Sequence, residues 1–191
     1  HYPLRRQRQM CIRDSRWLGI DIGGTRTRLM LMDDPQRWLK FQQIATASWA
    51  TSAEALLQLA RQIGQFIDAQ PVSGAMLGLP GILSRDRQQV LSLPFIPQLD
   101  NQPVAVRLSA LLGMPVAMDK DVNHLMLWDL LQRPTLPDSA VGLYLGTGMG
   151  NSLWLNGRFY HGAHGAAGEL GHIPFGAVSY THLTLPTKRI V

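Results

Sequence analysis

The chain has 191 residues, 46% hydrophobic and 16% charged, which predicts a soluble globular protein with a buried core. No run approaches the ~20 apolar residues of a membrane span, and no apolar stretch follows the basic start, so we expect a cytoplasmic protein without a membrane or secretory segment. The single cysteine, Cys11, excludes an internal disulfide framework and a cysteine-rich zinc site within this chain.

The formal net charge of +5 is carried by the two ends of the chain. Residues 1–15 hold four arginines against one aspartate, and residues 178–191 hold Lys188 and Arg189, while the body between them is balanced. A neutral body offers no electrostatic face for nucleic acid, so we expect none as a partner. Both ends lack a helical or strand period and resemble translated adapter sequence, and we interpret them as non-native extensions.

The first predicted elements are strands over residues 17–21 and 26–32, which flank a turn at Gly23-Gly24. Residues 38–44 add a third strand. Because the connections are short, the three strands predict an antiparallel meander.

A helix is predicted next, because residues 51–54 have the spacing of a capping box and apolar residues recur on one face up to about residue 69. These apolar residues are Leu56, Ala60, Ile63 and Ile67. A short apolar strand over 74–79, a helix over 104–112 and a buried strand over 116–118 complete this part.

A third helix is predicted from about Asp121 to just before Pro134, with Leu127, Leu130 and Leu131 on a shared face. Residues 133–138 are the predicted linker, and the strand pattern then starts again. The predicted strands are 140–145, 151–155 and 158–160. Strands followed by helices, repeated twice, predict an α/β protein with a duplicated plan.

Two glycine-rich turns are candidate phosphate-binding sites, Asp21-Ile22-Gly23-Gly24-Thr25 and Leu145-Gly146-Thr147-Gly148-Met149-Gly150. Glycine permits positive φ and lets the backbone approach a ligand closely, so that amide hydrogens can point at phosphate oxygens. The threonine hydroxyls add donors. Either turn by itself is also consistent with an ordinary β-turn.

Two further motifs accompany these turns, Lys120-Asp121-Val122-Asn123 and the glycine-rich run from Gly162 to His172. With them the chain resembles the ROK family of sugar kinases and repressors from Leu18 to Gly176, and the run from Tyr144 to Gly176 is similar to its allose-kinase branch. The resemblance implies an actin-like ATPase (ribonuclease H-like) α/β fold. It also implies that the first lobe, residues 16–133, is complete and the second lobe, residues 138–177, is truncated.

The resemblance assigns Asp121 as the catalytic base that accepts the proton of the attacking hydroxyl. An aspartate at a helix start is also a common N-cap, so a purely structural role is the alternative. Asp21 is expected near the Mg²⁺ and phosphates of ATP, with a turn-capping role as its alternative. The resemblance assigns further phosphate contacts to Gly23, Gly24, Thr25, Gly146, Thr147, Gly148 and Gly150.

The sugar site implied by the resemblance includes Glu169 and His172 in the glycine-rich loop, together with Asn123, which either supports the base or touches the sugar. Lys120 stands where many family members have an asparagine that contacts the sugar. Its basic character is similar to the allose-kinase branch. In the family this histidine also ligates a structural zinc with downstream cysteines, so His172 is a zinc ligand only in the full-length parent.

The function implied for the parent protein is ATP-dependent phosphorylation of the 6-hydroxyl of a hexose, with D-allose the favoured sugar. Glucose and an N-acylated hexosamine are the alternative substrates, and a sugar-sensing transcriptional repressor is the alternative function. The family also implies a homodimer. Because most of the second lobe is absent, we expect no turnover from this chain by itself.

Overall fold

The structure is a computed structural model, which describes residues 16–34, 37–146 and 148–172. The chain divides into two compact units, His1–Asp119 and Lys120–Val191. None of the helices in the described ranges is long and apolar enough to cross a membrane.

A five-stranded sheet with the order β3-β2-β1-β4-β7 forms the centre of the first unit. The strands are β1 (Trp17–Ile22), β2 (Arg26–Asp34), β3 (Arg37–Ala45), β4 (Gly74–Leu79) and β7 (Val116–Lys120). The first three pair antiparallel, which confirms the predicted meander, and β4 pairs parallel to β1.

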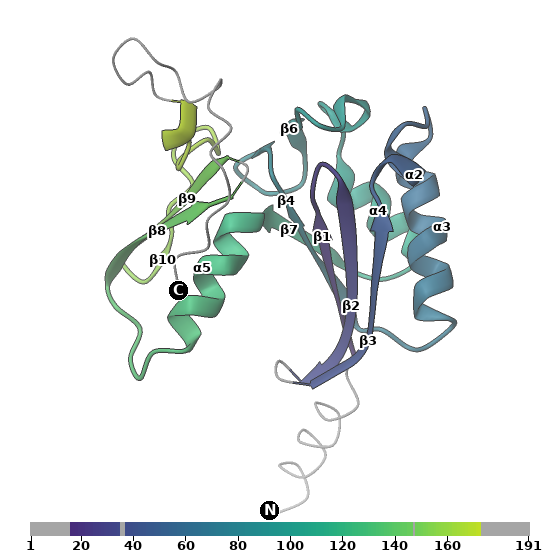
Figure 1. Cartoon of the computed structure of the whole chain (residues 1–191), viewed down its shortest axis with the longest axis horizontal. Coiled ribbons are helices and arrows are strands. Elements are labelled where there is room, and N and C mark those ends of the chain that lie inside the picture. Colours follow the sequence, from purple (N-terminus) through teal and green to yellow (C-terminus); the bar gives the residue numbers. More distant parts are fainter. Residues whose placement is uncertain (1–15, 35–36, 147, 173–191) are drawn as a thin grey trace, which may run out of the picture. The chain divides into compact units, whose positions relative to one another are not determined.

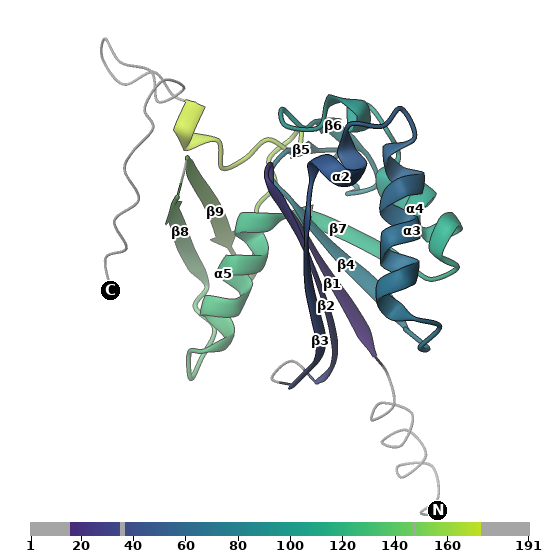
Figure 2. The same ribbon diagram turned by 45° about the vertical axis from the view of Figure 1, so that its right-hand side comes forward.

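Helices α3 (Ala55–Ile67) and α4 (Val104–Leu112) lie on the same face of this sheet, with the short helix α2 (Ala47–Ala50) beside them (Figure 1; Figure 2). Alternate residues of β1 and β2 point to that face, where Leu18 is paired with Leu31 and Ile20 with Leu29. All four side chains are buried, as expected for a sheet with one face packed against helices and the more exposed residues on the other face.

The start of α3 differs from the sequence prediction. Glu54 is the N-cap and makes no side-chain capping bond, and the hydroxyl of Ser52 accepts a hydrogen bond from the Glu54 amide instead. The predicted capping box at residues 51–54 is therefore wrong, because a separate short helix, α2, precedes this segment. The sequence also missed the hairpin of β5 (Ile82–Leu83) and β6 (Val90–Ser92).

The second unit consists of helix α5 (Asp121–Leu131) and a three-stranded antiparallel sheet of order β10-β9-β8. Its strands are β8 (Ser139–Leu145), β9 (Met149–Leu155) and β10 (Arg158–Phe159), and a short 3-10 helix, η2 (Leu170–His172), follows. The helix packs on β9, and Figure 2 shows it alongside β8 and β9.

The core of the second unit joins Met126 and Leu130 of α5 to Trp154 of β9. Leu127 and Leu131 are instead 37% and 59% exposed, so of the three leucines predicted to share a face only Leu130 is buried. The buried pair is spaced i, i+4, whereas the sequence holds leucines on more than one side of the helix and does not show which side meets a sheet. The two compact units divide between Asp119 and Lys120, before α5. The lobe boundary predicted at residues 133–138, after this helix, stays a prediction.

Candidate active site

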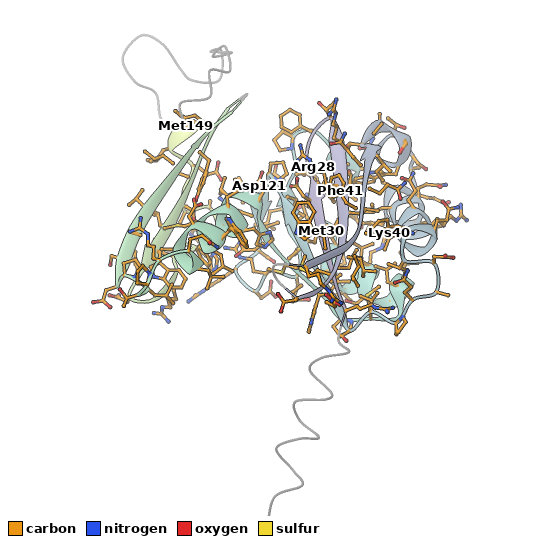
Figure 3. All side chains as sticks on the ribbon, turned by 60° about the horizontal axis from the view of Figure 1, so that its bottom comes forward. Arg28, Met30, Lys40, Phe41, Asp121 and Met149 are labelled. Carbon is orange, nitrogen blue, oxygen red and sulfur yellow. The ribbon has the colours of Figure 1, made fainter. Side chains whose placement is uncertain are left out.

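Asp121 occupies the first position of helix α5, immediately after β7 ends at Lys120. The N-cap residue is Lys120, with an extended backbone, so Asp121 is not the N-cap. Its Oδ1 accepts a hydrogen bond from the Val122 amide at 2.8 Å, and the residue is half-buried. A carboxylate in the first turn is favoured by the helix dipole, which suits a charged proton acceptor. Figure 3 shows Asp121 at this end of the helix.

Lys120 is a buried cation, only 5% exposed. Its ammonium group donates to the Ala167 carbonyl at 3.0 Å and forms an ion pair with the Glu169 carboxylate. A buried charge is costly unless it is paired and hydrogen-bonded, and both partners here come from the glycine-rich loop. The structure therefore joins two predicted substrate residues, Lys120 and Glu169, although 49 positions separate them in the sequence.

Asn123 lies in the first turn of α5 and is 5% exposed. Its Oδ1 accepts a hydrogen bond of 2.6 Å from the Ser152 hydroxyl on β9. Both side chains are buried, an environment in which such a bond contributes to the placement of the helix. This contact joins the start of α5 to β9, and the two roles that the sequence leaves open for Asn123 stay predictions.

The glycine-rich loop lies against strand β9 through Asn151. The Oδ1 atom of Asn151 accepts the Leu170 amide at 3.0 Å, and earlier in the loop the Ala167 amide donates to the His161 carbonyl at 3.1 Å. Gly168 has a φ of +90°, so it requires glycine. Asn151 and Ser152 were not predicted as site residues, although a polar pair within an otherwise apolar strand is a signal that could have identified them.

The first glycine turn belongs to the first unit and closes by a hydrogen bond of 3.0 Å from the Gly23 amide to the Arg26 carbonyl. The Thr46 hydroxyl donates to the Gly23 carbonyl at 2.7 Å, and the Thr46 amide donates to the Thr25 carbonyl at 2.9 Å. A side chain at Gly24 would come within 3.0 Å of the Phe95 ring. The turn is thus fixed from both sides while Gly24 and Thr25 stay exposed.

The carboxylate of Asp21 pairs with Arg28 across the neighbouring strand, with Nη1 and Oδ2 2.6 Å apart. The two side chains are 45% and 49% exposed, so solvent screens the attraction. Arg28 is labelled on the sheet in Figure 3.

The second glycine turn belongs to the second unit, where the Gly146 amide donates to the Gly148 carbonyl at 2.9 Å. Both glycines are exposed, and a Cβ at either would meet no atom within 4 Å. Thr147 lies outside the described residues. Gly150 differs, because a Cβ there would lie 2.5 Å from Cγ1 of Val122.

The two candidate phosphate turns do not use the ability of glycine to adopt positive φ. None of Gly23, Gly24, Gly146, Gly148 and Gly150 adopts the left-handed region. Tight contacts explain Gly24 and Gly150, and the open surroundings of Gly146 and Gly148 leave their backbone accessible to a ligand. An accessible backbone without side chains fits the approach of a polyphosphate.

A second charged pair lies near the end of β7, within the first unit. Arg87, from the turn between β5 and β6, pairs with Asp119 at 3.3 Å between Nε and Oδ1. Burial lowers the pKa of Arg87 from its ordinary value, and the nearby Asp119 charge partly offsets this effect. The pair anchors the hairpin to the strand that leads into Asp121.

The proposed zinc role of His172 concerns a side chain outside the described part of the chain; only its backbone, in η2, is described. Within the described residues, no group of three or more His, Cys, Asp or Glu side chains could hold a metal ion. The zinc site stays a prediction for the full-length parent.

Comparison with known proteins identifies the chain's relatives. The sequence profile of the ROK family matches residues 17–182. The N-acetyl-D-glucosamine kinase of Salmonella heidelberg (strain SL476) is 31% identical over 182 residues, which cover 91% of this chain and 58% of that protein. The chain therefore spans little more than half the length of this curated relative.

Two solved structures share the fold. A ROK family glucokinase from Streptomyces griseus, in complex with glucose and AMPPNP, has a TM-score of 0.71 and 24% identity, covering 83% of this chain and 50% of its own. A ROK family transcriptional regulator, a homolog of the E. coli MLC protein, also has a TM-score of 0.71 and 24% identity, covering 84% of this chain and 41% of its own. The predicted actin-like α/β fold is confirmed, and the fold is common to kinases and regulators.

Proposed function

The chain belongs to the ROK family, and from this premise we propose that the full-length protein transfers the γ-phosphoryl group of ATP to the 6-hydroxyl of a hexose. One observation carries the proposal. Asp121, at the first position of α5, directly follows Lys120, whose ammonium group is paired with Glu169. A proton acceptor is thereby joined to a polar pair able to hold sugar hydroxyls, as a sugar kinase requires.

In the proposed reaction, Asp121 accepts the proton of the 6-hydroxyl as that oxygen attacks the phosphoryl group. The Glu169 carboxylate accepts hydrogen bonds from sugar hydroxyls and so orients the ring. The exposed backbone of the glycine turn at Gly146–Gly148 would contact the phosphates of ATP, and Mg²⁺ would neutralise their charge. The phosphate contacts assigned to the turn at Gly23-Gly24 stay a prediction.

We favour D-allose as the sugar because Lys120 replaces the asparagine that many family members carry. An ammonium group only donates hydrogen bonds, whereas an asparagine amide both donates and accepts them, so the two residues select different hydroxyl orientations. N-acetyl-D-glucosamine is the alternative substrate, supported by the similarity to the N-acetyl-D-glucosamine kinase of Salmonella heidelberg. Glucose, which is bound in the Streptomyces griseus structure, comes next.

A sugar-sensing regulator is the second candidate function, since a regulator of the family shares the fold. Both kinds of protein bind sugar, but only a kinase needs a proton acceptor beside the reacting hydroxyl. Asp121 at the start of α5 therefore favours the kinase.

The test is phosphorylation of allose, N-acetylglucosamine, N-acetylmannosamine and glucose by the full-length protein and its Asp121→Asn variant. The variant keeps the size of the side chain and removes the proton acceptor. We expect turnover on at least one hexose, with kcat at least about 100-fold lower in Asp121→Asn and sugar binding retained. Sugar binding without turnover in the unmodified protein would support the regulator.

A further inference from the structure

Asn151 stands out because a polar side chain occupies a buried position in the middle of strand β9. Its exposed fraction is 1%, and its Oδ1 accepts the amide of Leu170 at 3.0 Å. Leu170 directly follows Glu169. The bond therefore fixes the loop backbone one residue from the carboxylate that pairs with Lys120.

The loop lies on the backbone of β9 on both sides of Glu169. A Cβ at Gly168 would lie 2.6 Å from the Asn151 carbonyl oxygen, and one at Gly171 would lie 2.7 Å from the Met149 carbonyl oxygen. Both distances are too short for any residue that carries a Cβ atom, so both positions require glycine. Figure 3 labels Met149, the first residue of β9.

The next residue of the strand, Ser152, points to the opposite face, as strand alternation requires. There its hydroxyl donates to Asn123, two residues after Asp121. Two adjacent buried side chains of β9 thus link the strand to the loop that carries Glu169 and to the helix that begins with Asp121.

We propose that Asn151 is a positioning residue for the sugar site, which holds Glu169 in place against Lys120 through the Leu170 amide. The inference rests on the proposed sugar kinase function and deepens it. Glu169 is only partly buried, with 34% of its side chain exposed, so its orientation depends on the backbone that carries it. Without the Asn151 bond, the segment around Glu169 loses a fixed point next to the ligand group.

The experiment uses Asn151→Ala and Asn151→Leu in the full-length protein. Alanine removes the acceptor, and leucine removes it while keeping the number and branching of the side-chain heavy atoms, so that one variant remains informative if the other does not fold. Trp154→Phe is the matched control: it removes a partly buried hydrogen bond of the same strand, from the indole of Trp154 to the Pro137 carbonyl, and changes no hydrogen bond of the glycine-rich loop.

Two readouts separate positioning from general stability. In the Asn151 variants we expect the KM for the sugar to rise at least about tenfold, which corresponds to about 1.4 kcal/mol, with kcat changed less than about threefold. We also expect faster amide hydrogen exchange in residues 168–171 than in the unmodified protein. The Trp154→Phe control should leave both readouts unchanged.

The inference is overturned if a folded Asn151 variant keeps the KM and the exchange of residues 168–171, or if Trp154→Phe changes both equally. If the unmodified protein phosphorylates no hexose, the proposed function fails by itself. Hydrogen exchange and calorimetric sugar binding then still decide the role of Asn151, because neither needs turnover.

Discussion

The ion pair of Lys120 and Glu169 predicts an asymmetric effect on stability when either partner is replaced. The Lys120 side chain is 7% exposed and that of Glu169 is 34% exposed. Glu169→Gln removes the negative charge that is paired with the buried ammonium group. Lys120→Met removes the buried charge itself and leaves a carboxylate that water can reach.

The expected loss of unfolding free energy lies between the values for fully buried and fully exposed ion pairs. Removing one partner of a fully buried pair costs about 3 to 5 kcal/mol, and exposed pairs contribute less than about 1 kcal/mol. Because Glu169 is partly solvated, we expect Glu169→Gln to lower the free energy of unfolding by about 2 kcal/mol. Lys120→Met should lower it by less than about 1 kcal/mol, and the double variant should match Lys120→Met.

Native-state hydrogen exchange of the amides in α5 and β9 is the suitable assay, because it reports the opening of the second unit alone. Asp129→Asn is a control that alters an exposed carboxylate of the same helix, the one that accepts the Tyr144 hydroxyl. We expect less than about 0.5 kcal/mol from it.

The expected asymmetry between the two variants is refuted if Glu169→Gln changes the free energy of opening by no more than the Asp129→Asn control. It is refuted equally if Lys120→Met is the more damaging of the two, since this would mean that burial of the ammonium group is not what makes its partner necessary.

Two further predictions concern the first unit. The Leu77 side chain is 0% exposed, so Leu77→Ala should leave a cavity and lower the free energy of unfolding by about 3 kcal/mol. Met76 is 41% exposed, and Met76→Ala should lower this free energy by less than about 1 kcal/mol. Equal losses in urea unfolding would contradict this prediction. The pKa of Asp86 is lowered from 3.8, first by the Ser84 hydroxyl and then by the Gln88 amide, so its stabilising effect is present above 3.8 and lost as pH falls through the lower folded value. In Ser84→Ala, an NMR titration should show this pKa rising toward 3.8, and an unchanged value would show that the hydroxyl is not its cause.

The sequence was informative wherever local periodicity and turn residues agreed. Strand β4 has the predicted bounds 74–79 and helix α4 the predicted bounds 104–112. Gly113 ends α4 with a φ of +67°, a backbone conformation that glycine adopts at little cost. These element boundaries depend only on residues that are close in the sequence, so tertiary packing does not alter them.

The prediction failed where a choice depended on a distant partner. The hydrophobic pattern of α5 allows several buried faces, and packing against Trp154 of β9 selects the face of Met126 and Leu130. The capping box predicted before α3 does not form because the short helix α2 precedes this segment. Trp49 of α2 is completely buried, and its indole donates a hydrogen bond to Thr27 on the sheet.

Periodicity and short motifs in the sequence were enough to predict the longer strands and helices, the family and the position of Asp121 at a helix start, but not α2 or the β5–β6 hairpin. The pairing of the buried Lys120 with Glu169, and the hydrogen bond that Asn151 accepts from the Leu170 amide, became visible in the tertiary structure. These contacts join residues 19 to 49 positions apart, and no local pattern specifies which distant carboxylate or amide meets a given side chain. That choice is made by the packing of β9, α5 and the glycine-rich loop.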